Sequence, residues 1–254
     1  MDPVRVMTYN VRVDTPEDGA NAWRYRRDAL ASTIRYHDPD VLGLQEPLRD
    51  QLTDVRERVD YRFVGASRGA GEAADEYVPI GFRRERFALV DTGTFWLSET
   101  PDISGSVGWD ATHPRICTRA RLRDRESDEE FVVFCLHLDH DGESARRRGA
   151  ELVRERAAAI ADAPVVVVGD FNCEAGDPPH DVLADSFRDA RDVATHDHGP
   201  DTSRTDYRSL DPDRTIDHVF VSDEWDVRTR AACSDQYGDG RYPSDHLPVV
   251  VDLA

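Results

Sequence analysis

VVVVGDFN, residues 165–172, is the stretch that decides the predicted fold of this 254-residue chain. Its four β-branched residues in a row are typical of a strand that is buried on both faces. Gly169 frees the backbone where the strand ends. Asp170 and Asn172 follow one residue apart, so their side chains point the same way if the chain stays extended. A carboxylate and an amide in this place are typical of the ligand-binding edge of an α/β sheet, although both residues are also common in surface turns.

Apolar runs elsewhere predict further strands, and amphipathic stretches between them predict helices. Strands are expected at residues 4–10, 40–46, 61–65, 79–83, 87–98, 113–123, 131–140, 215–222 and 247–253. Helices are expected at residues 23–38, 49–59, 144–161 and 180–190. We predict a hairpin from segments 79–83 and 87–98, and a mobile loop from the Gly- and Ala-rich segment 67–75. Strands and helices interleave without a shift in composition, which predicts one layered α/β domain over residues 1–254.

The charge of the chain is unusual. The formal net charge is -19, and all 32 basic residues are arginine because the sequence contains no lysine. An acidic surface without lysine favours the hypothesis of a halophilic source, whose proteins must stay hydrated in concentrated salt. A mesophile with arginine-rich codon usage is the alternative. In either case such a surface repels polyanions at ordinary ionic strength.

Nothing in the sequence indicates a membrane segment or a secretory signal. The apolar runs are far too short to span a bilayer, and the first residues lack a basic start followed by an apolar run. The four cysteines form no CxxC pair, and Cys135 lies inside an apolar run typical of a buried thiol. We therefore expect a cytoplasmic monomer with no membrane partner.

Polar residues recur next to the apolar strands. Six segments each carry an acid, an amide or an imidazole in this position: Asn10, Glu46, His137, Asp170 with Asn172, Asp217, and Asp245 with His246. Each has an ordinary explanation as a strand end, a turn or a core group, but six together indicate one shared site. Carboxylate and amide oxygens suit Mg²⁺ or Mn²⁺ better than Zn²⁺. His137 and His140 form an HxxH, which on a strand would place the two rings on opposite faces.

Six short motifs give the chain a family resemblance: TYNVR, GLQE, LHLDH, GDFN, IDHVF and SDHLP. In this order, over residues 9–248, they resemble the motif series of the endonuclease/exonuclease/phosphatase superfamily. That superfamily includes pancreatic-type deoxyribonucleases, abasic-site endonucleases, inositol polyphosphate phosphatases, sphingomyelinases and deadenylases. The resemblance implies a four-layer sandwich in which two packed mixed β-sheets are flanked by helices, with the site at one rim. It also implies Mg²⁺-dependent cleavage of phosphate esters, with Mn²⁺ as the alternative metal.

The resemblance further implies which residues hold the metal. Glu46 is expected to be the principal ligand, with Asn10 close by and Asp245 beside the metal region. One position departs from the abasic-site endonucleases, which have an aspartate two residues after the asparagine of the first motif. Arg12 occupies that place here. Because an arginine grips phosphate but does not bind metal, this departure weakens the interpretation as an abasic-site enzyme.

The catalytic roles also follow from the resemblance. Asp170 is expected to orient or deprotonate the attacking water, and Asn172 to form a hydrogen bond near the same centre. Asp217 and His246 are expected to form a carboxylate–imidazole pair, and His137 to contact the phosphoryl group. A positioned imidazole suits this chemistry because it can donate a hydrogen bond as negative charge builds on the phosphoryl oxygens.

The substrate is the least determined part of the prediction. Arg12, Arg83 and Arg115 are expected at the mouth of the site. Their positive charge is enough to bind one or two phosphates. Acidic and aromatic residues beside them suit a small organic group: Glu76, Tyr77, Trp96, Trp109 and Asp110. We therefore expect a small phosphodiester or phosphomonoester as substrate. The alternative for both tryptophans is a place in the core. The alternative functions are a nuclease acting on DNA or RNA and a catalytically silent binding or scaffold module.

Overall fold

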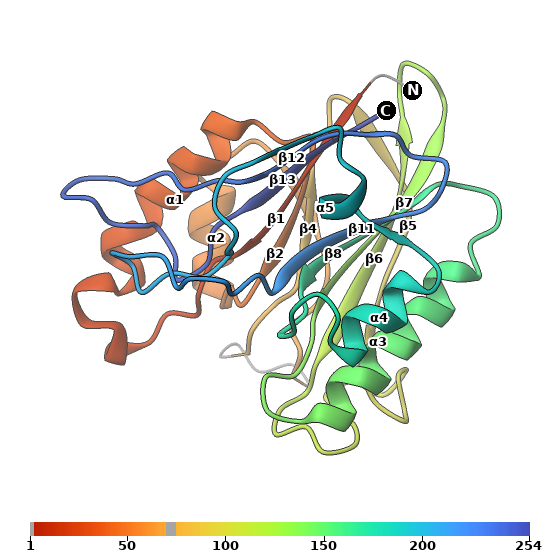
Figure 1. Ribbon diagram of the computed structural model, residues 1–254, viewed down its shortest axis with the longest axis horizontal. Coiled ribbons are helices and arrows are strands. Elements are labelled where there is room, and N and C mark those ends of the chain that lie inside the picture. The colour runs from red at the N-terminus through yellow and green to blue at the C-terminus, as the bar shows by residue number, and fades with distance from the viewer. Residues whose placement is uncertain (1–2, 70–74) are drawn as a thin grey trace.

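The computed structural model describes residues 3–69 and 75–254 (Figure 1). Two mixed β-sheets pack face to face, and helices cover the outer face of each. The predicted four-layer sandwich is therefore confirmed. No helix within the described residues is long and apolar enough to cross a membrane.

The first sheet has seven strands, and its centre joins the two ends of the chain. Across the sheet they are β10 (His196–His198), β12 (Val227–Ala232), β13 (Val249–Leu253), β1 (Val4–Asn10), β2 (Val41–Gln45), β4 (Ile80–Phe82) and β3 (Arg62–Val64). β1 runs parallel to β2 and antiparallel to β13. Asn10 therefore lies beside Gln45, and Val4 lies opposite Leu253.

The second sheet has six strands, with the valine-rich strand of the GDFN motif near its middle. Across the sheet they are β5 (Phe87–Trp96), β6 (Ile116–Asp124), β7 (Glu130–His137), β8 (Val165–Asp170), β11 (Asp217–Val221) and β9 (Arg188–Asp189). β8 runs parallel to β7 and antiparallel to β11. The register places Asp170 between His137 and Asp217 on the neighbouring strands.

Helices bury the outer face of each sheet. The first sheet is covered by α1 (Trp23–His37) and α2 (Arg49–Arg56), and the second by α3 (Glu143–Ala158) and α4 (Pro178–Ala184). A 3-10 helix (Pro16–Asn21) and α5 (Ala190–Val193) are short connectors. Leu30 and Ile34 of α1 lie in one apolar cluster with Met7, whereas Val153 of α3 lies in another with Val167. Arg147 and Glu151 form an ion pair on the surface of α3, with 3.2 Å between the two charged groups.

The alternation of side chains along the strands sends the polar residues into the interior of the sandwich. On β8, Val166 and Val168 face the other sheet, and Asp170 continues their row at the strand end. On β1, Val6 faces the interior and Asn10 continues that row. The interior row of β7 ends in His137, and that of β11, which runs the opposite way to β8, begins with Asp217. The site residues are therefore the last members of the same rows that build the core.

The sheets approach closely just behind this polar rim. A Cβ added to Gly43 of β2 would lie 2.7 Å from Val168 Cγ2 and 2.8 Å from Cys135 Sγ, both on the opposite sheet. Only a residue without a side chain fits there. The close approach lets Asn10 of the first sheet reach Asp170 of the second, with 2.9 Å between Nδ2 and Oδ2.

Three sequence predictions of local structure need comment. The hairpin over residues 79–98 is wrong, because β4 pairs with β2 and β3 whereas β5 pairs with β6 in the other sheet. β12 was not predicted, since its sequence VRTRAA alternates only weakly between apolar and polar residues. Of the loop predicted over 67–75, residues 70–74 lie outside the described residues.

Candidate active site

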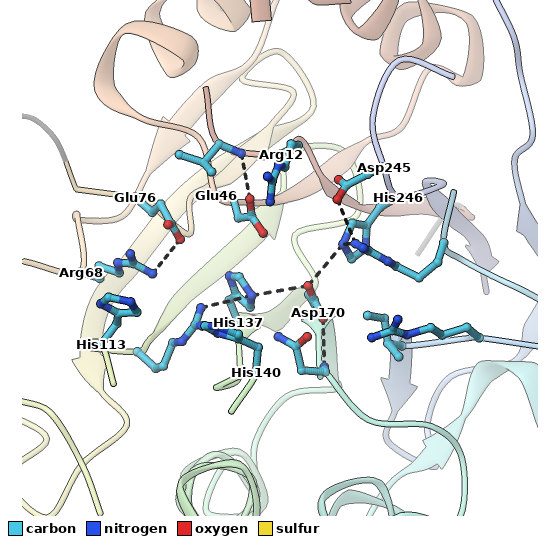
Figure 2. Close-up of a pocket in the computed structure, with 16 residues that line it drawn as sticks. Arg12, Glu46, Arg68, Glu76, His113, His137, His140, Asp170, Asp245 and His246 are labelled. Atoms are coloured by element: carbon cyan, nitrogen blue, oxygen red, sulfur yellow. Dashed lines mark hydrogen bonds and ion pairs between the residues drawn. The ribbon is translucent and has the colours of Figure 1, made fainter. Parts of the chain in front are cut away.

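A cavity of about 310 Å³ opens at the rim where the polar strand ends meet (Figure 2). It is lined by Arg12, Val13, Glu46, Arg68, Glu76, His113, Arg115, His137, His140, Asp170, Asn172, Arg204, Arg214, Ile216, Asp245 and His246. Of the residues expected to bind metal or act in catalysis, all but two line this cavity. Asn10 and Asp217 lie directly behind it and contact residues that do.

Asn10 joins the two carboxylates at the centre of the site. Its Nδ2 atom donates to Glu46 Oε1 over 2.8 Å and to Asp170 Oδ2 over 2.9 Å, and the residue is fully buried. Its Oδ1 atom accepts from the backbone N–H of Arg12 over 2.9 Å. In this arrangement the amide positions both acids from directly behind the cavity.

Unusual backbone conformations fix the same carboxylates. Arg12, Glu46 and Asn172 all have left-handed backbones, with φ of 57°, 72° and 49°. Few non-glycine residues adopt this region, and such strain collects at functional sites. The turns direct backbone N–H groups at the acids: Val13 donates to Glu46 Oε2 over 2.8 Å, and Asn172 donates to Asp170 Oδ1 over 2.9 Å. The extended geometry predicted for residues 170–172 is thus wrong, because Asn172 turns back and its side chain donates to the Leu138 carbonyl.

Asp217 and His246 form the predicted carboxylate–imidazole pair. His246 Nδ1 lies 2.8 Å from Asp217 Oδ2, and both side chains are buried. Burial lowers the pKa of His246, but the negative charges of Asp217 and Asp170 outweigh it and raise the pKa to about 9. The other ring nitrogen, Nε2, faces Asp170 Oδ2 at 3.7 Å. Burial raises the pKa of Asp170 to about 6, which is close to the working range of a general base at neutral pH.

Arg115 contacts the two histidines of the HxxH segment. Its guanidinium nitrogens lie 3.2 Å from His137 Nε2 and 2.6 Å from His140 Nδ1. Asp139 Oδ2 accepts from Arg115 Nε over 3.2 Å. Burial and the Arg115 charge lower the pKa of His137 well below its usual range, so the ring is neutral. The prediction that His137 and His140 diverge is wrong, because β7 ends at His137 and strand alternation no longer applies at residue 140.

The donor set at the base of the cavity fits a divalent cation. Glu46, His137 and Asp170 each offer a ligand atom within 4.8 Å of the others. His137 Nε2 and Asp170 Oδ2 are 3.4 Å apart, and a neutral imidazole with an adjacent carboxylate is a common cation-binding combination. Asp245, expected beside the metal region, lines the same cavity and accepts from Arg204 NH1 over 3.1 Å. The structure thus brings His137 and Asp170 to Glu46, with Asn10 bonded to both carboxylates.

The residues expected to bind substrate divide into two groups. Arg12, Glu76 and Arg115 line the cavity, whereas Trp96, Trp109 and Arg83 do not. Trp96 is 7% exposed and packs in the core between the sheets. Trp109 lies on a neighbouring loop, where its backbone N–H donates to Glu99. Arg83 forms ion pairs with acids that precede β2: Asp38 and Asp40.

Five polar residues of the cavity were not predicted as site residues from the sequence: Arg68, His113, His140, Arg204 and Arg214. Arginine is the only basic residue type with a permanent charge in this chain, so one arginine on a loop carries little signal. His113 stands two residues before Arg115, and that proximity was the only available indication. Within the described residues, five arginines gather around the acidic centre, which suits a negatively charged group bound between them.

A sandwich of two mixed sheets with carboxylates, imidazoles and arginines at one rim is typical of hydrolases that act on phosphate esters. A model of the Endonuclease/Exonuclease/phosphatase family matches residues 7–246, and the chain belongs to this family. Members of the family hydrolyse phosphoester bonds and typically depend on a divalent metal. The protein is accordingly a hydrolase acting on phosphoesters.

Known relatives differ in the activities that their names state. The structure of a mannosyl-6-phosphatase from Bacteroides thetaiotaomicron VPI-5482 is 33% identical with a TM-score of 0.94, covering 99% of each chain. The human Nocturnin catalytic domain is 21% identical with a TM-score of 0.76, covering 99% of this chain and 93% of that one, and shows the fold alone. The exoribonuclease subunit Ccr4 of Emericella nidulans is 25% identical over 169 residues, which are 55% of this chain and 25% of that protein.

Proposed function

We propose that the protein is a Mg²⁺-dependent phosphatase for a small phosphate ester. The observation that carries the proposal is the composition of the cavity. A carboxylate–imidazole group that fits a cation lies at the base of the cavity, and five arginines also line it. The volume of the cavity is about 310 Å³. Such a volume is at the lower end of ligand pockets, and it suits a molecule of the size of a phosphorylated monosaccharide.

The residues of the chain supply the proton transfers. Asp170 accepts a proton from the attacking water, because its pKa of about 6 keeps the carboxylate ionised near neutral pH. His246 remains protonated with a pKa of about 9 and donates a hydrogen bond to a phosphoryl oxygen as charge builds there. Asp217 holds the imidazole in place through Nδ1. Arg12, which lines the cavity beside Glu46, adds positive charge for the phosphoryl group.

Glu46, His137 and Asp170 would hold the cation. A bound Mg²⁺ or Mn²⁺ would supply positive charge that neutralises the phosphoryl oxygens and stabilises the leaving oxygen. Asn10 keeps Glu46 and Asp170 close to each other, because both accept from the same amide. Their carboxylates are thereby arranged before a cation arrives, which reduces the reorganisation needed for binding.

Charge and relatives both support a small substrate over a polymer. Proteins bind long nucleic acids chiefly through many phosphate contacts, and a net charge of -19 opposes such contacts outside the cavity. The match to a mannosyl-6-phosphatase over nearly the whole of both chains supports a phosphorylated sugar as the first class to test. The second candidate is an exoribonuclease activity, which the partial match to Ccr4 favours.

A substrate panel tests the proposal. The purified chain should be assayed with Mg²⁺, Mn²⁺ or EDTA on hexose 6-phosphates, bis-p-nitrophenyl phosphate, oligo(A) and supercoiled plasmid. We expect the highest kcat/KM for a sugar phosphate, with loss of activity in EDTA. A kcat/KM at least ten times higher for oligo(A) or plasmid would replace the phosphatase with a nuclease.

A further inference from the structure

One wall of the cavity consists of an arginine and a carboxylate that bind each other and not the catalytic acids. Arg68 NH1 donates to Glu76 Oε2 over 2.8 Å, and both side chains are about one-seventh exposed, at 15% and 14%. Figure 2 shows the pair at one side of the cavity, with His246 at the other side and Glu46 and His137 between them. The pair therefore lies where the organic part of a bound phosphate ester would extend.

The backbone holds this pair in a fixed place. The N–H of Arg68 donates to the carbonyl of Glu76 over 2.8 Å, so the two residues face each other across a short antiparallel ladder. The carbonyl of Arg68 accepts from the Trp96 indole over 2.6 Å, and Trp96 is anchored in the core. Tyr77, which follows Glu76 in the chain, donates its backbone N–H to the Pro47 carbonyl over 2.8 Å. These contacts give the wall the rigidity that a specific subsite needs.

The chemistry of the pair suits hydroxyl groups. A carboxylate accepts and a guanidinium donates, whereas a hydroxyl does both. The Nε atom of Arg68 is buried and has no hydrogen-bond partner among the described residues. The wall therefore has one unused donor that a ligand oxygen could accept from. His113 lies beside the pair in the same cavity, and burial lowers its pKa, which keeps the imidazole neutral.

Two other classes of group fit this wall poorly. A second phosphate would meet the Glu76 carboxylate, which already offsets the Arg68 charge at 2.8 Å. A nucleobase usually stacks on an aromatic side chain, but no described lining residue is Phe, Tyr or Trp. An uncharged group with several hydroxyls satisfies the wall without these conflicts.

We propose that Arg68 and Glu76 form a subsite that binds the hydroxyl groups of a sugar, or of another polyol, whose phosphate lies at the catalytic centre. The inference rests on the proposed phosphatase function and adds the residues that select its substrate. A buried pair built to bind hydroxyls discriminates strongly against an analogue that lacks them, because its donor and acceptor then stay unpaired.

The test compares two esters of the same shape. One is a hexopyranose 6-phosphate, chosen as the best hexose substrate of the unchanged protein. The other is (tetrahydropyran-2-yl)methyl phosphate, which has the same ring and leaving oxygen without the hydroxyls. The quantity measured is the ratio of kcat/KM for the two esters. Because both are assayed on the same preparation, a fraction of unfolded protein cancels from the ratio.

The variants are Glu76→Gln and the double variant Arg68→Met with Glu76→Gln, which leaves no unpaired charge. We expect the ratio to fall at least tenfold in both. The matched control removes an arginine–glutamate pair outside the cavity through Arg147→Met with Glu151→Gln on α3, and its ratio should stay unchanged.

Three results would overturn the inference. The first is a ratio near one for the unchanged protein, and the second is a ratio that the two cavity variants leave unmoved. The third is an equal fall in the control, which would indicate a general effect on folding. Failure of the proposed function looks different, because the unchanged protein would then hydrolyse no phosphate monoester with Mg²⁺ or Mn²⁺, and both proposals would be wrong together.

Discussion

Replacing Asp217 with asparagine tests how the catalytic imidazole keeps its proton. The substitution preserves shape and removes the negative charge 2.8 Å from His246 Nδ1. Burial opposes the protonated form of His246, so its pKa of about 9 depends on the neighbouring carboxylates, of which Asp217 contributes most. Without that charge the pKa should return at least to the ordinary histidine value of about 6.5.

The size of the effect follows from these two values. At pH 8, an imidazole with a pKa of about 9 is about 90% protonated, whereas one with a pKa of about 6.5 is about 3% protonated. If the proton is required, kcat/KM at pH 8 should fall about thirtyfold. The sign is fixed as well: activity of the unchanged protein should decline as pH rises through about 9, and activity of the variant should already decline near or below pH 6.5. Activity of the variant should therefore be highest near pH 6, because the imidazole is protonated there and Asp170, with a pKa of about 6, is still partly ionised.

The assay is a pH profile of kcat/KM on the best substrate, with saturating metal at each pH. His246→Ala provides one control, because without the imidazole its activity should be low throughout and should show no decline through about pH 9. Asp189→Asn provides a matched control, since Asp189 pairs with His180 in a buried cluster that does not line the cavity. If the alkaline limb of Asp217→Asn coincides with that of the unchanged protein, Asp217 does not retain the proton and the reasoning is refuted.

Three further predictions concern the metal, the salt and the core. Glu46→Gln should weaken Mg²⁺ binding, as measured by calorimetry. Asp170→Asn removes the base as well as a carboxylate that would hold the cation, and it should slow turnover by about two to four orders of magnitude; full turnover of Asp170→Asn would exclude its role as a base. The melting temperature should climb steeply between 0.1 M and 1 M salt as the Debye length shrinks from about 10 Å to about 3 Å, and a flat profile would contradict the halophile hypothesis. Gly43→Ala should lower the free energy of unfolding by about 1–3 kcal/mol in urea titrations, because the new Cβ meets Val168 and Cys135 on the other sheet. An unchanged midpoint would show that the two sheets shift to accept the Cβ without loss of stability.

Strand ends were the part of the site that the sequence could predict. The interior rows of β7 and β8 are apolar up to the rim, where they end in His137 and Asp170, and the row of β11 begins at the rim with Asp217. On β1, the polar residues Thr8 and Asn10 follow the apolar residues Val4 and Val6. A change from apolar to polar within a two-residue period is visible in one sequence without any structure. It identified Asn10, His137, Asp170 and Asp217 because strand geometry alone determines where they point.

Loop residues escaped prediction because no period determines their direction. Arg204 reaches Asp245 and His246 from a loop with little regular structure, and Arg68 depends on a ladder of two short segments. The pairing of β4 with β2 rather than with β5 is likewise a choice between two sheets that neighbouring residues do not encode. Trp96 illustrates the same limit, since an indole near the site in sequence proved to support the wall from the core.

The pairing of β1 with β13 has a consequence for the newly made chain. Asn10 is synthesised long before His246 and the strand that follows it. Ser244 Oγ donates to the carbonyl of Asn10 over 2.7 Å, so two segments that lie far apart in the sequence meet at the catalytic centre. Contacts between such distant segments form late in folding, because a long loop must close before they are made. Activity should thus appear only when β13 has paired with β1, after the local helices have formed.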